Sequence, residues 1–292
     1  MTLPCTLELT PHLPDFPVAV RAMVRPPETL YVKGQLPHGP GVAIVGTRGA
    51  NEPAIEYTER LASFLTRHGI VVWSGGAAGI DAAAHRGALD AGGRTVVVMG
   101  TGFDQTYPAE HRGLFEQVLE RGGAWVGMLP PSHPGTKWSF LQRNELLAAL
   151  VEAVVMVQAP LRSGARSTVA AARRMGRRIW VVPAAPWDPL GAGCADELSH
   201  GAERMPGASA LASVLLGRRL EGAGAGAPAD PPSDLGPADR AVYEAVASGS
   251  GHPDEICGKT GLPARLVSQA LLTLSMRHVL VQGSDGRIRT AN

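Results

Sequence analysis

The middle of the chain alternates short apolar runs with stretches of helical period. The apolar runs, rich in valine and isoleucine, lie at 42–45, 70–73, 95–99, 124–128, 153–157 and 179–182. Between the first two, residues 54–68 repeat apolar side chains with the period of a helix that buries one face, directly behind Pro53. Continuous apolar strands separated by helices are typical of a parallel sheet buried on both faces. We therefore expect residues 41–216 to form an α/β domain with a doubly wound, mostly parallel sheet.

The segment before this domain has a different pattern. Residues 1–40 are rich in proline and weakly periodic. This composition predicts an extended N-terminal segment that packs on the core, with one short strand at Leu30–Lys33.

The C-terminal part is predicted to be a separate domain. Residues 217–233 lose all apolar pattern and are rich in glycine, alanine and proline, which predicts a flexible linker. The remainder, 234–292, has helical patterns followed by two short strands joined across Ser284, Asp285 and Gly286. The helices are expected at 237–247, 253–260 and 263–277. This order is typical of a winged helix-turn-helix domain.

The composition of the chain indicates the cellular compartment in which the protein is expected. The 292 residues are 45% apolar and carry a formal net charge of +1, so any basic surface must be local. Three scattered cysteines with no C-x-x-C pair indicate a reducing compartment. No basic stretch followed by an apolar run opens the chain, and the longest apolar run, 146–157, is interrupted by Glu152. We expect a cytoplasmic protein with no signal peptide and no membrane partner.

Small residues follow the predicted strands. Glycine-rich turns that open onto helices present free amides and the positive end of the helix dipole, which suits anions. The alternative is that these glycines only end strands. Four such turns at the carboxyl edge of one sheet favour a groove for a ligand. Its candidate residues are Gly46, Thr47 and Arg48; Ser74, Gly75 and Gly76; Gly100 and Gly102; and Ser163 and Gly164.

The first of these turns, Gly46-Thr47-Arg48, does not fit a mononucleotide or dinucleotide site. The G-x-G-x-x-G spacing is absent, the second strand ends without an acidic residue for a ribose, and no G-K-[ST] occurs. Arg48 is therefore interpreted as a cation that reads a phosphodiester with its bidentate guanidinium. The alternative is a surface arginine that only solvates the turn.

A further cationic stretch supports this interpretation. Residues 136–150 interleave Lys137 and Arg143 with Trp138 and Phe140, directly before Asn144. Aromatic side chains flanked by cations hold single-stranded nucleic acid by stacking on its bases. The alternative is that Trp138 and Phe140 fill the core beneath a loop.

A second pair of arginines flanks the Ser163-Gly164 turn. Arg162 and Arg166 lie on either side of it, at the start of a predicted helix. Arg166 is therefore a candidate for the ligand edge as well.

Catalytic interpretations are less well supported. Asp81 and His85 lie four residues apart on one helix, and Ser74 precedes them, but no G-x-S-x-G nucleophile motif is present. We expect Asp81 to orient the start of its helix and His85 to form a local hydrogen bond. No His, Cys and Asp spacing typical of a metal site occurs, so neither a metal nor a cofactor is expected.

Five motifs occur in order along the α/β domain. They are a G-[ST]-R loop at 46–48, S-G-x-A-x-G-I-D-x-x-A-H at 74–85, G-x-G-x-D-x-x-Y-P at 100–108, F-x-x-R-N at 140–144 and S-G-x-x-x-T at 163–168. Together they resemble the DNA-processing protein A family (DprA, also called Smf). The resemblance implies a Rossmann-like domain that dimerises, binds single-stranded DNA without catalysis, and helps to load the RecA recombinase during natural transformation.

Carried over residue by residue, the resemblance centres the DNA contacts on three motifs. These are Arg48 of the G-T-R loop, the Phe140, Arg143 and Asn144 segment, and the Ser163-Gly164 turn. The chain departs from the family pattern at Leu141, where proline is common, at Glu145, where a second arginine is common, and at Gln158, where glutamate is usual. We expect Arg166 to compensate for the arginine missing at 145.

An enzyme on a related fold is the alternative. Nucleotide-sugar and nucleoside-monophosphate hydrolases resemble the first two glycine loops and use P-G-G-x-G-T-x-x-E to place a catalytic glutamate. The nearest equivalent here is the acid-free SGARST at 163–168. The absence of this catalytic glutamate favours a binding protein over an enzyme.

The winged-helix segment is not expected to bind duplex DNA. Residues 234–292 hold six acidic and six basic side chains. Duplex binding needs several cations on one surface. This domain is therefore interpreted as an element for protein interaction or dimer modulation.

Overall fold

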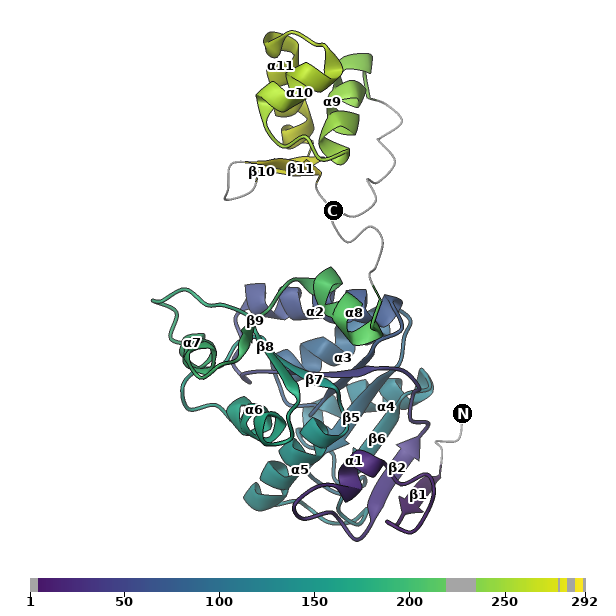
Figure 1. Cartoon of the computed structure of the whole chain (residues 1–292). Helices are drawn as coiled ribbons and strands as arrows, with labels where there is room; N and C mark the ends of the chain where they lie inside the picture. The colour runs from purple at the N-terminus through teal and green to yellow at the C-terminus, as the bar shows by residue number, and fades with distance from the viewer. Residues whose placement is uncertain (1–4, 219–234, 278, 283–286, 291–292) are drawn as a thin grey trace. The chain divides into compact units, whose positions relative to one another are not determined.

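The computed structural model describes residues 5–218, 235–277, 279–282 and 287–290. The chain divides into two compact units, Met1–Arg219 and Leu220–Asn292 (Figure 1). Most of the predicted linker, 219–233, lies outside the described residues. None of the described helices is long and apolar enough to cross a lipid bilayer.

The first unit contains a nine-stranded sheet in the order β1-β2-β6-β5-β4-β3-β7-β8-β9. The seven strands from β6 to β9 in this order pair in parallel, and β2 joins β6 antiparallel. The doubly wound, mostly parallel sheet expected from the sequence is confirmed. The strands are β1 (Thr6–Leu9), β2 (Leu30–Gly34), β3 (Gly41–Val45), β4 (Val71–Ser74), β5 (Thr95–Met99), β6 (Ala124–Gly127), β7 (Ala153–Met156), β8 (Arg178–Val181) and β9 (Glu203–Arg204).

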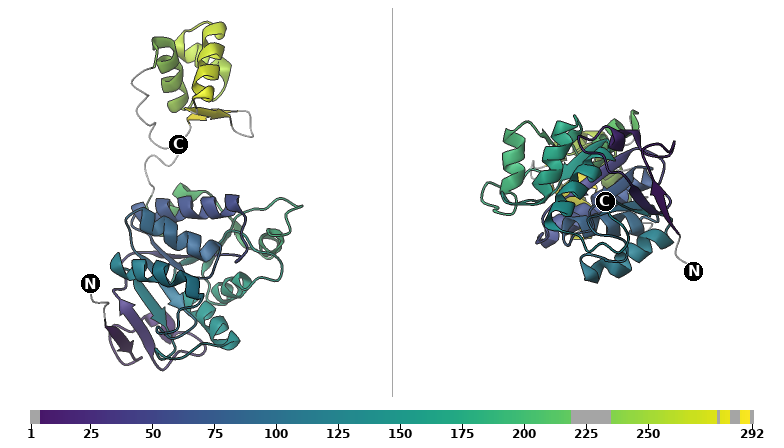
Figure 2. Two further views of the ribbon diagram at one scale, coloured as in Figure 1. Left: turned by 180° about the vertical axis from the view of Figure 1, so that it is seen from behind. Right: turned by 90° about the horizontal axis from the view of Figure 1, so that it is seen from below.

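Helices cover both faces of this sheet, as the two opposite views of Figures 1 and 2 show. On one face, α3 and α4 pack against the side chains of Val97 and Met99; on the other, α1, α5 and α6 share a core with Val96 and Val98. Successive residues of β5 are therefore buried on opposite faces, which is why its sequence is a continuous apolar run. The helices are α1 (Val18–Arg21), α2 (Glu52–Arg67), α3 (Ile80–Asp90), α4 (Arg112–Glu120), α5 (Lys137–Ala149), α6 (Ala165–Arg174), α7 (Ala192–Ser199) and α8 (Ala208–Leu216).

The N-terminal segment is more regular than its sequence predicts. The strand at Leu30–Lys33 is present as β2, but the expectation of an otherwise extended segment is wrong, because β1 pairs with β2 and α1 lies between them. Phe16 and Val20 are fully buried in the core beneath α5. Both missed elements have four residues, too few for a period of hydrophobicity to be visible.

The sheet changes winding direction beside β3. From β3 the chain continues through β4 and β5 to β6, and then returns through α5 to β7 on the other side of β3. Ligands of such sheets bind beyond the carboxyl ends of the strands at this switch point. A capping box between Thr136 and Ser139 begins α5, and the Ser139 hydroxyl donates to Gly100 O at 2.7 Å. The start of α5 is thereby anchored at this edge of the sheet.

The second unit is a small winged-helix domain. It contains α9 (Pro237–Ala247), α10 (Pro253–Thr260), α11 (Ala264–Met276) and the antiparallel strands β10 (Leu280–Gln282) and β11 (Ile288–Thr290). The helices bury Val242, Ile256 and Leu274 in a core of their own. All five predicted elements are present; the turn at 284–286 lies outside the described residues.

Candidate nucleic-acid interface

A cavity of about 390 Å³ opens at the switch point of the sheet. Its walls come from the turn after β3, the start of α3, one side of α5 and the turn that precedes α6. It brings together nine of the residues that the sequence singles out: Gly46, Thr47, Arg48, Lys137, Phe140, Arg143, Asn144, Ser163 and Gly164.

The charge of this cavity is positive. Arg48, Lys137 and Arg162 line it as exposed cations, and Arg143 lines it as a buried one, whereas Asp81 is the carboxylate among its lining residues. The ten-residue helix α6 begins at the cavity, so the positive end of its dipole adds to the field. An anionic backbone is therefore the ligand chemistry that this cavity favours.

Two aromatic rings continue the cavity beside Arg48. The Arg48 guanidinium carbon lies 6.0 Å from the centre of the Tyr107 ring, whose centre is 5.3 Å from that of Phe140. Both rings border an adjoining hollow of about 200 Å³ that Gly75 also lines. Tyr107 was not predicted as a site residue, although the Y-P of the third motif contains it.

Arg143 is held beneath the cavity floor. Arg143 is only 6% exposed, and its Nη1 donates to Val98 O at 3.1 Å. The guanidinium packs directly on Gly75, where a Cβ atom would lie 1.5 Å from Nη1. Nε donates to no atom of the described chain. Arg143 therefore joins α5 to the ends of β4 and β5.

Asp81 is the buried carboxyl whose charge acts on this arginine. Its Oδ2 accepts from the backbone amides of Gly75 at 3.2 Å and Ala77 at 3.4 Å, so Asp81 orders the turn that precedes α3 rather than capping the helix itself. Burial raises the pKa of Asp81, while the charge of Arg143 and these backbone amides act in the opposite direction. The two buried groups thus depend on each other for their ionised forms.

The triad interpretation of Ser74, Asp81 and His85 is wrong for this fold. The Ser74 hydroxyl donates to Ile44 O at 2.6 Å, and His85 Nδ1 lies 2.9 Å from Thr95 Oγ1. The three groups serve separate contacts. Among the described residues, no group of three or more His, Cys, Asp or Glu side chains is arranged to hold a metal ion.

His85 makes the stability of the first unit pH-dependent. The Thr95 hydroxyl donates its proton to Val72 O, so His85 Nδ1 is the donor to Thr95 Oγ1. Burial lowers the pKa of His85 to about 3. Below about pH 6.5 the unfolded chain binds a proton that the folded chain does not, so stability is lost as the pH falls.

We expect the free energy of unfolding to fall between pH 7 and pH 5 by about 2 kcal/mol more in the native chain than in His85→Gln. Urea unfolding at the two pH values measures this. An identical drop in His85→Gln would contradict the assignment.

Several glycines of the predicted groove do not reach the cavity. Gly76, Gly100 and Gly102 pack against other parts of the chain: a Cβ atom would lie 2.3 Å from the Phe115 ring at Gly76, 2.5 Å from the Phe140 ring at Gly100 and 2.1 Å from Pro130 O at Gly102. These three, with the buried Ser74, do not line the cavity. They are small because neighbouring atoms approach them closely, and the prediction that they form the groove is corrected.

Asn144 orders the turn at the start of α6. Its side-chain amide donates to Ser167 Oγ at 2.6 Å and to Gly164 O at 3.4 Å. Ser163 Oγ accepts from the Ala165 amide at 3.3 Å. Asn144 therefore couples α5 to the anion-facing end of α6.

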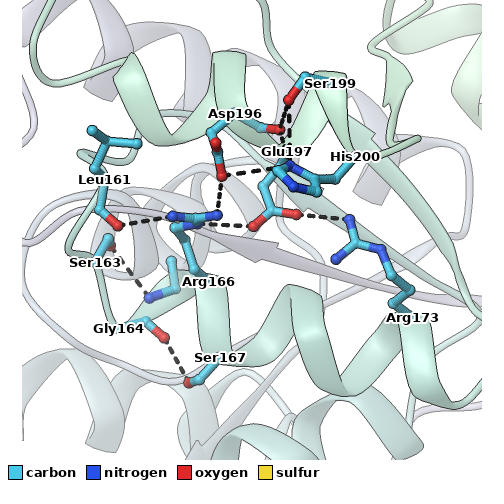
Figure 3. A network of polar contacts seen from close by, with 11 residues as sticks. Leu161, Ser163, Gly164, Arg166, Ser167, Arg173, Asp196, Glu197, Ser199 and His200 are labelled. Carbon is cyan, nitrogen blue, oxygen red and sulfur yellow. Dashed lines mark hydrogen bonds and ion pairs between the residues drawn. The ribbon is translucent and has the colours of Figure 1, made fainter.

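Arg166 does not line this cavity, contrary to expectation. Figure 3 shows its guanidinium turned towards α7, where it pairs with Asp196 and, at 2.8 Å, with Glu197. Glu197 also pairs with Arg173 at 2.7 Å. Two carboxylates from a helix about thirty residues further along the chain thus hold Arg166. Arg162, two residues before Gly164, is the arginine of this segment that faces the cavity.

A sequence model of the family described as DNA recombination-mediator protein A matches residues 8–215. The chain belongs to this family, the DNA-processing protein A (DprA) family. A model of the DprA winged helix domain also matches residues 226–286, in agreement with the second unit.

Relatives within the DprA family include one from Mycobacterium tuberculosis that is 40% identical over 254 residues. This alignment covers 85% of the chain and 63% of that relative, so the chain spans less than two thirds of the relative's length. The structure of the Streptococcus pneumoniae protein is 29% identical with a TM-score of 0.66, covering 71% of this chain and 73% of that one. A Helicobacter pylori structure, described for its single-stranded DNA binding mode, is 28% identical with a TM-score of 0.65, covering 73% and 96%.

Positions where the chain departs from the DprA pattern have contacts of their own. Glu145 pairs with Arg174 at 2.8 Å, so the two charges neutralise each other at the surface of α5 and α6. Gln158 is buried, and its side-chain oxygen accepts from the Asn51 amide at 3.1 Å. Trp138 is 59% exposed, which rules out the interpretation that it fills the core.

Proposed function

We propose that this chain binds single-stranded DNA at the cavity formed by β3, α5 and the start of α6, without catalysing a reaction on it. The observation that carries the proposal is the convergence of Arg48, Lys137 and Arg162 with the rings of Phe140 and Tyr107 at one sheet edge. Cations track a sugar-phosphate backbone, and aromatic rings accept bases of any sequence. Membership of a DNA-processing family and the Helicobacter pylori relative described by its single-stranded DNA binding mode support the same ligand.

We further propose that the bound strand is passed to the RecA recombinase and that the chain acts as a homodimer in the cytoplasm during natural transformation. This part rests on the family alone. Its test is whether the protein accelerates RecA filament formation on a strand already coated by a single-strand binding protein, alongside sedimentation of the protein alone.

The winged-helix unit is proposed to take no essential part in strand binding. Its six acidic and six basic residues balance, and α11 exposes Leu272 (63%) and Met276 (74%) rather than a row of cations. Such a helix fits protein contact better than a major groove.

A mobility-shift series tests the binding proposal. The full chain is expected to shift a single strand at salt concentrations where a duplex of equal length is not shifted, because unstacked bases are available only in the single strand. A protein truncated after Arg218 is expected to keep most of this affinity. Equal affinity for the duplex, or loss of binding on truncation, would contradict the proposal.

A further inference from the structure

A second and larger depression lies beside the cavity, on the other side of α5. Its volume is about 900 Å³, and its walls come from residues 23–31, the segment 128–130, α5 and α6. We call it the α5 groove; its apolar lining includes Val24, Pro26, Tyr31, Met128, Trp138 and Leu141.

The α5 groove exposes apolar side chains to an unusual degree. Val24 is 94% exposed, Trp138 59% and Leu141 46%. Three of the five tryptophans of the chain are buried in the first unit, namely Trp73, Trp125 and Trp180. An exposed tryptophan at the entrance of a groove is therefore a surface for a ligand with an apolar or aromatic face.

The charges of the α5 groove balance. Arg25 and Arg174 face Glu28 and Glu145 among its lining residues, and Arg174 and Glu145 are paired with each other at 2.8 Å. The groove thus lacks the cationic excess that a phosphate would require, in contrast to the neighbouring cavity.

The cavity and the groove lie next to each other along the start of α5 and share a lining residue. Lys137 lines the cavity, the next residue, Trp138, lines the groove, and Leu141 lines both. A cationic track beside an apolar, aromatic surface is the arrangement by which proteins hold a single strand, with the backbone on one side and the bases on the other.

We propose that the α5 groove receives unpaired bases of the strand whose backbone lies in the cavity, with Trp138 as the stacking surface. This inference rests on the proposed function and extends it, because it assigns the segment 23–31 and α6 to base contact. The occupant is nucleic acid rather than a protein segment because the groove lies directly beside a cationic cavity and has no net charge of its own.

The test distinguishes binding through the bases from binding through the phosphates. Affinities are measured for an oligothymidylate of about 15 nucleotides and for an abasic strand of equal length, which has the same phosphates and no bases. The native chain should prefer the thymidylate. In Trp138→Ala the affinity for thymidylate should fall roughly fivefold to a hundredfold, while that for the abasic strand stays within about twofold and the salt slope is unchanged.

Trp187 provides the matched control, since it is 84% exposed and does not line the groove. Trp187→Ala should bind both strands as the native chain does. Thymidylate should also quench the tryptophan emission of the native chain and of Trp187→Phe, but not of Trp138→Phe, because a stacked base quenches only the ring that it covers.

The outcomes distinguish this proposal from the one on which it rests. If the native chain binds neither strand, the proposed function fails and the groove assignment with it. If the native chain binds thymidylate and Trp138→Ala binds it equally well, the groove holds another occupant, such as a protein. If Trp138→Ala weakens both strands alike, the tryptophan acts on the backbone. Either of the last two results overturns the groove assignment and leaves single-strand binding intact.

Discussion

Replacing Arg143 by methionine is expected to lower the free energy of unfolding of the first unit by about 3 kcal/mol or more. The substitution keeps most of the side-chain volume but removes the cation that compensates the buried carboxyl of Asp81. An uncompensated buried charge costs far more than the pair contributes when intact. Urea unfolding monitored by circular dichroism measures the loss.

A cycle with Asp81 identifies the cause of this destabilisation. The double variant Asp81→Asn with Arg143→Met should be more stable than Arg143→Met alone, since the stranded carboxylate is gone. Arg174→Met is the control: that arginine lies on α6 and its pair with Glu145 is exposed, so the cost should be about 0.5 kcal/mol or less. A similar small cost for Arg143→Met would show that its buried charge stabilises nothing.

The second large effect concerns binding rather than folding. Arg48→Ala should weaken single-strand binding about tenfold or more and leave stability unchanged, because Arg48 is exposed and a charge-assisted phosphate contact contributes roughly 1.5–3 kcal/mol. The logarithmic salt slope should also flatten by about 0.7, the value for one phosphate contact on a single strand. Titrations over a salt series measure both quantities.

The control for Arg48 is an arginine away from the cavity. Arg60 on α2 is exposed and pairs with Glu56, so Arg60→Ala should bind within about twofold of the native chain. Unchanged affinity and an unchanged slope in folded Arg48→Ala would remove this residue from the interface.

The long elements of this fold could be predicted from sequence because each carries its own signal. The strand runs at 42–45 and 95–99 and the helix behind Pro53 appear within a residue or two of their predicted positions. The four-residue elements β1 and α1 had no such signal, since pairing with β2 and packing on α5 create them. Their order depends on contacts that are distant in sequence.

A site residue could be predicted where its type and its place at a strand end indicate a single role. It could not be predicted where the same residue type serves either the ligand or the packing of the protein. Glycine occurs both where a ligand can approach and where the protein packs on itself; the residue type is the same for Gly164, which lines the cavity with no atom close to it, and for Gly102, which packs on Pro130. Arg166 and Arg162 likewise differ only in their partners. The carboxylates that hold Arg166 come from α7, and no local pattern reveals them.

The close packing behind the glycine turns has a consequence for how a strand is captured. Ile80 lies against Gly46, the Arg143 guanidinium against Gly75 and the Phe140 ring against Gly100. Side chains of the protein therefore pack against these turns and hold their backbone in place. Such turns need not become ordered when a ligand arrives, and little conformational entropy is lost on association. For the proposed single-strand binding, we expect capture to be limited by diffusion and by attraction between the cations and the phosphates rather than by a slow rearrangement. We also expect a strand held in this way to dissociate quickly once salt screens those charges.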